Sequence, residues 1–325
     1  MLIRDIKREE LSRVWELIKD NSFELNFEDL EEHFEKSVEM VAFEDINIGF
    51  ALIRFLYTED GKRVYEISVF INPKFRLNGY GTLLVNYLEN TINKETASVI
   101  RIDNMLKYND ASEFLGKIGY AMWFSSSLMI YEGGVLEHTQ MDLVPYDDKY
   151  FKSYVQLLDE AFYQISIENN LSTKPTPMTE KFRNELIRTS HEFSLLISNE
   201  ELIGVVQVTD DHVTRAMVGK SARGKGYGGS LIKFATNKIL NNGLVPKLFI
   251  MDTNIHARKL YESIGYNLVS TVHVYRKTDW FLYSNTIYLF QQLESKFEVN
   301  DFKLRYSKAL MVFYCLITPW GGVLL

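Results

Sequence analysis

Residues 71–81 read INPKFRLNGYG and residues 218–228 read VGKSARGKGYG. Each stretch begins with an apolar residue and ends in the pattern Arg-x-x-Gly-x-Gly. The offset between Arg76 and Arg223 is 147 residues. A second landmark, Ile-Gly-Tyr at residues 118–120, returns at residues 264–266 with an offset of 146. Two landmarks displaced by nearly the same distance, at the spacing of a whole domain, indicate a tandem duplication.

The duplication divides the chain of 325 residues into three parts. We expect one domain over residues 1–135, a second over residues 138–277, and a C-terminal extension without an assigned role over residues 278–325. The linker is expected around Gly133 and Gly134. Two domains are also what the length favours, at about 150 residues per domain.

The composition is that of a globular protein, with 46% hydrophobic and 24% charged residues. The formal net charge of −7 argues against a nucleic-acid partner bound through phosphate contacts. It suits a cationic substrate, and it is also ordinary for a cytoplasmic protein. The single cysteine, Cys315, excludes an intramolecular disulfide and fits a reducing compartment.

No targeting or membrane segment is expected. Charged residues begin at Arg4 and no apolar run follows them, so the N-terminus does not resemble a signal peptide. We therefore expect a cytoplasmic location. Residues 309–325 are uncharged, but they are shorter than the roughly 20 residues of a membrane-spanning helix and contain Pro319, Gly321 and Gly322. Membrane contact by this tail is therefore not favoured.

Each half predicts the same succession of elements. A short strand leads into an amphipathic helix with apolar residues at helical spacing, such as Leu11, Val14 and Ile18. Two strands joined by a polar turn follow, then a fourth strand, the Arg-x-x-Gly-x-Gly loop and a second long helix. A fifth strand, a short helix and a final pair of strands close each half. The predicted class is mixed α/β, in which a mixed, mostly antiparallel central sheet is flanked by helices in each domain.

The Arg-x-x-Gly-x-Gly loop lies between a strand and a helix in both halves, which suits a phosphate site. Glycines let the backbone approach an anion, amide N–H groups point at its oxygens, and the helix N-terminus adds about half a positive charge. Arg223 and Lys225 add full charges. A tight turn with a positive φ would explain one glycine. It explains less well why two glycines and an arginine occur at the same spacing in both halves.

Two other phosphate loops fit less well. Residues 219–225 nearly match the nucleoside-triphosphate loop, but Gly226 stands where a Ser or Thr should hold Mg²⁺. A dinucleotide loop should follow the first strand of a βαβ unit, and here the loop follows the fourth strand.

A second motif in the second half reads Asn254-x-x-Ala257-x-x-Leu260-Tyr261-x-x-x-Gly265-Tyr266. Together with the loop, it resembles the GNAT superfamily of acyl-CoA-dependent N-acetyltransferases, and the tandem arrangement is similar to that of mycothiol synthase-type acetyltransferases. The first half carries the loop and only part of the second motif, as Ala111-x-x-Phe114-Leu115-x-x-x-Gly119-Tyr120. The two regions of resemblance cover residues 1–277.

The resemblance implies that acetyl-CoA is the co-substrate, that no metal takes part, and that the diphosphate binds the Arg-x-x-Gly-x-Gly loop. It also implies that the pantetheine arm lies between two splayed parallel strands, residues 213–218 and 247–252. The implied cofactor-binding residues are Val218, Arg223, Gly224, Lys225, Gly226, Tyr227, Gly228, Gly229 and Asn254 in the second half, and Ile71, Arg76, Asn78, Gly79 and Gly81 in the first. Asn254 is equally suited to cap the helix that it opens.

The resemblance assigns Tyr261 as the catalytic general acid. A thioester transfers its acyl group to an amine once the reactants are held together, and a neutral phenol can protonate the departing thiolate. We expect Leu260 to face the core and Tyr261 to lie one step round the helix. The equivalent residue in the first half is Leu115, which has no proton to give, so that half is expected to be degenerate unless Tyr108 or Tyr120 substitutes.

The sequence leaves the general base and the acceptor open. Carboxylates and a histidine occur on the fourth strands, as Glu66 in the first half and Asp210, Asp211 and His212 in the second. A histidine at a strand end is expected to be solvated. Residues 165–179 form the most irregular segment, and we expect them to select the acceptor.

Two functions from different classes follow. One is an N-acetyltransferase whose second half moves an acetyl group from acetyl-CoA to a primary amine of a small-molecule or peptide acceptor. The other is a non-catalytic sensor or scaffold that binds coenzyme A. A protein anchored to a membrane by its tail is a third and less favoured alternative.

Overall fold

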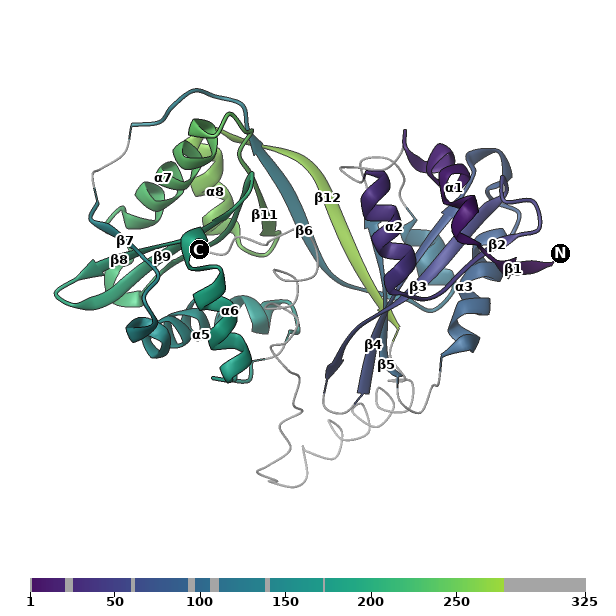
Figure 1. Ribbon diagram of the computed structural model, residues 1–325, viewed down its shortest axis with the longest axis horizontal. Coiled ribbons are helices and arrows are strands. Elements are labelled where there is room, and N and C mark those ends of the chain that lie inside the picture. Colours follow the sequence, from purple (N-terminus) through teal and green to yellow (C-terminus); the bar gives the residue numbers. More distant parts are fainter. Residues whose placement is uncertain are drawn as a thin grey trace, which may run out of the picture. The chain divides into compact units, whose positions relative to one another are not determined.

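The computed structural model forms two compact units, each a β-sheet covered by helices on both faces (Figure 1). Unit 1 comprises residues 2–123 together with residues 274–277, and unit 2 comprises residues 124–273. The expectations for the C-terminal extension fall outside the described residues. Among the helices that the structure describes, none has the length and apolar character of a membrane span. The structure describes residues 2–20, 26–59, 62–92, 97–105, 111–137, 141–171 and 173–277.

Unit 1 has a sheet in the order β1-β2-β3-β4-β5, followed by the end of β12. Helices α1 and α2 cover one face of this sheet, where Val14 and Leu30 are buried, and α3 and α4 cover the other face, where Leu88 and Leu115 are buried. The elements are β1 Ile3–Asp5, α1 Leu11–Ile18, α2 Phe27–Lys36, β2 Ser37–Phe43, β3 Gly49–Glu59, β4 Lys62–Ile71, α3 Tyr80–Thr91, β5 Ala97–Met105 and α4 Ser112–Lys117.

Unit 2 repeats this design with the order β7-β8-β9-β10-β11-β6, and β12 lies beside β6. Helices α7 and α8 cover one face, and α5 and α6 cover the other (Figure 1). The elements are β6 Ala121–Tyr131, β7 Leu143–Pro145, α5 Phe151–Glu168, α6 Glu180–Arg188, β8 Phe193–Ser198, β9 Glu201–Thr209, β10 His212–Val218, α7 Tyr227–Asn241, β11 Lys247–Met251, α8 Ile255–Ile264 and β12 Tyr266–Lys277. Short 3₁₀ turns are η1 Arg8–Glu10, η2 Pro73–Phe75, η3 Asp148–Tyr150, η4 Ser190–Glu192 and η5 Lys220–Ala222.

The mixed, mostly antiparallel sheet expected for each repeat is confirmed. Among the pairs with a recorded register, β4–β5 and β10–β11 are parallel and the others are antiparallel. The expected final pair of strands is wrong, because each half closes in one continuous strand, β6 or β12. The structure also adds α2 and α6, two short helices that the sequence analysis did not identify.

The strands β6 and β12 each pass from one unit into the other. From Phe124 onward β6 belongs to unit 2, where it pairs antiparallel with β11 from Ser126–Met251 to Ile130–Lys247. From Val274 onward β12 belongs to unit 1. There the Tyr275 hydroxyl donates a hydrogen bond of 2.7 Å to Ser112 Oγ, and Lys277 Nζ lies 2.8 Å from Glu89 Oε2. Each unit is therefore completed by a strand end that the other repeat supplies.

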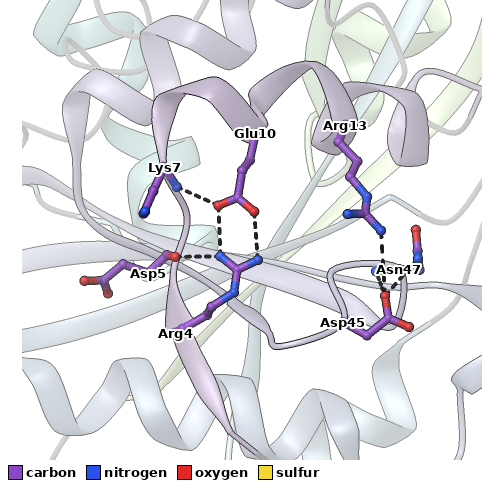
Figure 2. Close-up of polar contacts among 7 residues, drawn as sticks. All are labelled: Arg4, Asp5, Lys7, Glu10, Arg13, Asp45 and Asn47. Carbon is purple, nitrogen blue, oxygen red and sulfur yellow. Dashed lines mark hydrogen bonds and ion pairs between the residues drawn. The ribbon is translucent and has the colours of Figure 1, made fainter.

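An ion pair between Arg4 and Glu10 ties β1 to the turn that follows it (Figure 2). Two guanidinium nitrogens of Arg4 donate to the two oxygens of Glu10 at 2.7 and 2.8 Å, and the Lys7 N–H donates to the same carboxylate at 3.0 Å. These bonds, the one from Arg4 foremost, lower the pKa of Glu10 to about 2.

We expect Glu10→Gln to lower the free energy of unfolding at pH 7 by about 1 kcal/mol, less than the full pKa shift implies because solvent screens the pair. The pKa of Glu10 is depressed in the folded state, so its stabilisation is present above the ordinary value of 4.5 and is lost as the pH falls toward 2. Urea unfolding should therefore show a smaller difference between the two proteins at pH 3 than at pH 7. Glu9→Gln, at an exposed neighbour, is the control, and an equal difference at both pH values would contradict the assignment.

Candidate functional site

The Arg-x-x-Gly-x-Gly loop of unit 2 joins β10 to α7 through the turn η5. Gly224 has φ +74° and Gly226 has φ +85°, in the left-handed region that residues with a Cβ rarely adopt. A Cβ added at either glycine would meet no atom within 4 Å. This backbone conformation favours glycine at both positions, and the space above them is open.

An arginine fastens this loop to its strand in both units. Arg223 Nε donates to the carbonyl of Val218 at 3.0 Å, and Arg76 Nε donates to the carbonyl of Ile71 at 3.1 Å. The motif's arginine, for which the sequence predicted only a charge, therefore also fixes the loop's geometry. In unit 2 the Nη atoms of Arg223 have no partner recorded among the described residues, so they can bind an anion.

A cavity of about 660 Å³ opens beside this loop. Its walls are the loop with the start of α7, the start of α8, and the last two turns of α5. Lys225 does not line it, although the sequence placed it in the same set. The expected residues that do line it are Val218, Arg223, Gly224, Gly226, Tyr227, Gly228, Gly229 and Asn254.

The first turn of α7 presents backbone donors to the cavity. The first helical bond runs from the Ser230 N–H to the Gly226 carbonyl at 3.2 Å. The N–H groups of Tyr227, Gly228 and Gly229 precede it, so they have no acceptor within the helix. They stand at the positive end of the helix dipole, which favours an anion there.

The strands β10 and β11 diverge toward this cavity. Their parallel register is recorded at one pair, His212–Lys247, although β10 continues to Val218 and β11 to Met251. In unit 1, by contrast, β4 and β5 stay paired over four recorded positions. A bulge between Val213 and Arg215 further distorts β10, and such bulges re-aim side chains near functional sites. The splayed parallel strands that the resemblance implied are thus present in unit 2.

Asn254 caps its helix, as expected, and also lines the cavity. Its side-chain oxygen accepts the Ala257 N–H at 3.2 Å. The expected orientation of its neighbours is reversed, because Leu260 lines the cavity and Tyr261 is fully buried. The reason is the spacing of Ala257, Tyr261 and Ile264, which places Tyr261 on the face of α8 that packs against the core.

The Tyr261 hydroxyl is buried and has no hydrogen-bond partner among the residues that the structure describes. Burial raises the pKa of Tyr261 well above its ordinary value of 10, and the neighbouring Tyr266 adds to this. The phenol is therefore protonated throughout the physiological range. The Tyr261 hydroxyl is thus an unsatisfied buried donor, and Tyr261 is not among the residues that line the 660 Å³ cavity.

The loop of unit 1 has the same shape, but unit 1 has no hydroxyl at the position of Tyr261. Gly79, with φ +80°, precedes α3 as Gly226 precedes α7, and the Asn78 amide donates to the Phe75 and Arg76 carbonyls at 3.2 and 3.0 Å. At the positions of Gly224 and Tyr261 stand Leu77, fully exposed with φ +63°, and the buried Leu115.

The helix start of α3 is also partly covered in unit 1. A Cβ added at Gly81 would lie 3.1 Å from the Phe114 ring, at the place of Leu260 in unit 2. The Tyr120 hydroxyl, one of the two expected substitutes for Tyr261, donates to Glu89 at 2.8 Å. The other, Tyr108, lies outside the described residues.

The four candidate bases do not line the 660 Å³ cavity. Glu66 forms a buried ion pair of 2.7 Å with Arg54, and Asp211 lies 2.9 Å from Lys247 Nζ. His212 was expected to be solvated, but it is buried, because its ring stacks on Phe249 and its Nδ1 lies 2.5 Å from Asp211 Oδ1. Asp210 stands in the tight turn before β10 with φ +52°.

The α5 wall is the part of the site that the sequence did not predict. The segment 165–179 begins as helix, because α5 continues to Glu168. Ala161, Gln164 and Glu168 fall on one helical face and line the cavity together with Ile165. This i, i+3, i+7 spacing was readable, but nothing in the sequence indicated which face of α5 a cavity would meet.

Two side chains fix the remainder of that segment. Asp159 accepts hydrogen bonds from the Thr176 N–H at 3.1 Å and from its hydroxyl at 2.5 Å. Asn169 Nδ2 donates to Thr253 Oγ1 at 2.7 Å, which ties the end of α5 to the turn before α8. The end of α5 and the segment after it are therefore held in place by partly buried polar contacts.

Comparisons with known proteins place both repeats in one family. Residues 3–120 match the family model described as acetyltransferase (GNAT) family, and residues 167–282 match the model described as acetyltransferase (GNAT) domain. A search of curated protein sequences found no match.

Solved structures with a similar fold include acetyltransferases that span nearly the whole chain. A GCN5-related N-acetyltransferase from Sphaerobacter thermophilus has a TM-score of 0.66 at 15% identity, with 85% of this chain and 95% of that chain covered. A tandem GNAT protein from the clavulanic acid biosynthesis pathway has a TM-score of 0.60 at 11% identity, with 85% and 98% covered. A GNAT-family acetyltransferase from Colwellia psychrerythraea has a TM-score of 0.53 at 12% identity, with 86% and 100% covered. At these identities the likeness is one of fold.

Proposed function

Because this chain belongs to the GNAT superfamily of acetyltransferases and holds two such domains in tandem, we propose that unit 2 transfers an acetyl group from acetyl-CoA to a primary amine. The observation that carries the proposal is the cavity beside the loop, where the open glycines, the donors of α7 and the splayed strands meet. The acceptor is proposed to be a small molecule or a peptide.

The chain's own groups suit the binding of coenzyme A. The N–H groups of Tyr227, Gly228 and Gly229 and the guanidinium of Arg223 would hold the diphosphate, since they are the donors that border the cavity. The gap between β10 and β11 would take the pantetheine arm, whose amide groups need the backbone partners that the divergence of the strands leaves open.

Acetyl-CoA, when bound, supplies an acyl group already activated as a thioester. The amine nitrogen then forms a bond to the acyl carbon while the carbon–sulfur bond breaks, and the proton of the amine leaves through water. Tyr261 is proposed to donate its proton to the departing thiolate, because its hydroxyl is protonated and has no acceptor among the residues that the structure describes. Such general-acid help contributes roughly 10²–10⁴-fold.

Unit 1 is proposed to be the degenerate copy. It presents the loop residues Ile71, Arg76, Asn78, Gly79 and Gly81, so coenzyme A binding there remains part of the proposal. Leu115 has no proton for a thiolate, which supports the proposal that the chemistry takes place in unit 2.

We expect Gly226→Ala to raise the KM for acetyl-CoA by about tenfold, because a methyl group there enters the open space above the loop and the left-handed φ costs about 1–2 kcal/mol. Gly243→Ala is the matched control, since Gly243 has φ +75°, equally open surroundings, and no part in the cavity. It should lower stability to a similar extent and leave the KM unchanged.

The measurement is thiol release by the full chain over a panel of amines, together with calorimetric titration by acetyl-CoA. Thiol release that depends on the amine supports the transferase. Binding without release for any amine would favour the sensor or scaffold instead, and no binding at all would contradict both functions.

A further inference from the structure

Helices from both faces of the unit 2 sheet contribute to the wall of the 660 Å³ cavity. Helices α7 and α8 cover one face and α5 covers the other, and residues of all three helices line the cavity. Between these helices the strands β10 and β11 diverge. The donors that are proposed to hold the diphosphate belong to α7. The α5 side of the cavity therefore remains for the second reactant, the amine.

This α5 side carries a carboxylate. Glu168, in the last turn of α5, is exposed and lines the cavity. One of its oxygens accepts a hydrogen bond of 2.9 Å from the Gln164 amide, one turn earlier on the same helix. Among the described residues, Glu168 has no basic partner recorded, and no second carboxylate lines this cavity. Its negative charge is therefore available to a ligand.

The end of α5 adds to this negative charge. The helix ends at Glu168, so the negative end of its dipole lies there and favours a cation. The next residue, Asn169, donates to Thr253 Oγ1 at 2.7 Å, which fixes the helix end beside the turn before α8. Arg223 shares an adjoining cavity with Gln164, and Glu168 does not line that cavity. The positive and negative charges of the site therefore stand at different ends.

A carboxylate at this place suits a cation that does not react. It stabilises a nearby ammonium and raises the pKa of that ammonium. The amine that attacks the acyl carbon must instead lose its proton before the new bond forms. The cation that fits beside Glu168 is therefore a group of the acceptor that keeps its charge during the transfer.

We propose that unit 2 acetylates amines that carry a second positive charge, such as α,ω-diamines, and that Glu168 binds the ammonium that does not react. This inference rests on the proposed function, because it names the class of acceptor for the same transfer. Glu168 is then a specificity-determining residue, which holds the acceptor by its second charge and leaves the thioester and the reacting nitrogen to other groups.

The test measures thiol release by the full chain with acetyl-CoA and two series of acceptors, α,ω-diaminoalkanes and monoaminoalkanes of equal length. We expect the best diamine to have a KM about tenfold below that of the matching monoamine, the scale of one charge-assisted contact. Glu168→Gln removes the charge and keeps an oxygen for the Gln164 amide. It should raise the KM of the diamine about tenfold, change its kcat by less than about twofold, and abolish the preference.

Two further measurements accompany this comparison. Added salt should weaken the preference of the wild type for the diamine, because the carboxylate is exposed and its charge is screened. Glu201→Gln removes the same charge from the exposed start of β9, outside the cavity, and should change the KM of neither acceptor.

A wild type with equal KM values for diamine and monoamine would overturn the inference and leave the proposed function intact. Equal effects of Glu168→Gln on the two acceptors would overturn it in the same way, and so would a loss of kcat with both, which would make Glu168 part of the chemistry or of the scaffold. A wild type that binds acetyl-CoA and releases no thiol with any amine would contradict the proposed function itself.

Discussion

Tyr261→Phe is expected to lower kcat by tenfold or more, and in the same protein to leave the free energy of unfolding unchanged or raised by up to about 1 kcal/mol. The ring of Tyr261 is fully buried in the core of unit 2, so a phenylalanine ring fills the same space. The hydroxyl has no recorded internal acceptor, and removing an unsatisfied buried donor does not cost stability. The binding of coenzyme A should change little, because the hydroxyl acts on the leaving thiolate.

Tyr266→Phe provides the matched control. The Tyr266 hydroxyl forms a 2.7 Å hydrogen bond with Thr236 Oγ1, and its ring lies 6.1 Å from that of Tyr261. Its loss should lower stability by about 1 kcal/mol and leave kcat unchanged. Stopped assays of thiol release and urea unfolding on both variants separate the two roles, and an unchanged kcat in Tyr261→Phe would remove that residue from the mechanism.

A fragment of residues 138–277 is expected not to fold cooperatively, whereas a fragment of residues 121–277 is expected to do so. The shorter fragment lacks β6, the strand that pairs with β11 at five recorded positions. It also lacks Leu128 and Met129, which are fully buried in unit 2. Losing buried side chains of this size costs about 2–5 kcal/mol each, against a total stability of roughly 5–15 kcal/mol for a domain.

Circular dichroism and urea unfolding of the two fragments check this expectation. The longer one should unfold in a single sigmoidal transition, and the shorter one should show none. Equal cooperative transitions would mean that β6 is dispensable. Acceptor screens on unit 2 by itself should therefore use the longer fragment.

The repeat and its loop were predictable because their signals are local. Gly226 and its counterpart Gly79 adopt a left-handed backbone conformation that few other residues adopt, and the arginine three residues before each glycine binds the end of the preceding strand. The helices with apolar residues at helical spacing, and the strands around them, followed from the same kind of short-range pattern.

What the sequence could not provide are the features that depend on tertiary partners. The apolar residues of β6 indicate a buried strand whichever strand lies beside it, so the exchange of strand ends left no trace in the pattern. The orientation of Tyr261 depended on where the core lay under α8, and the fit of Gln164 and Glu168 to the cavity depended on the position of the loop. The sequence alone suggested a surface position for His212, because only the fold shows that Phe249 stacks on its ring.

The path of β12 bears on how the protein is made. Translation delivers residues 2–123 first, and multidomain proteins commonly fold from the N-terminus as they emerge from the ribosome. Here the earlier copy stays incomplete until residues 274–277 have been synthesised, because Tyr275 packs in its core and Lys277 pairs with Glu89. The nascent chain must therefore finish its second repeat before its first one can mature.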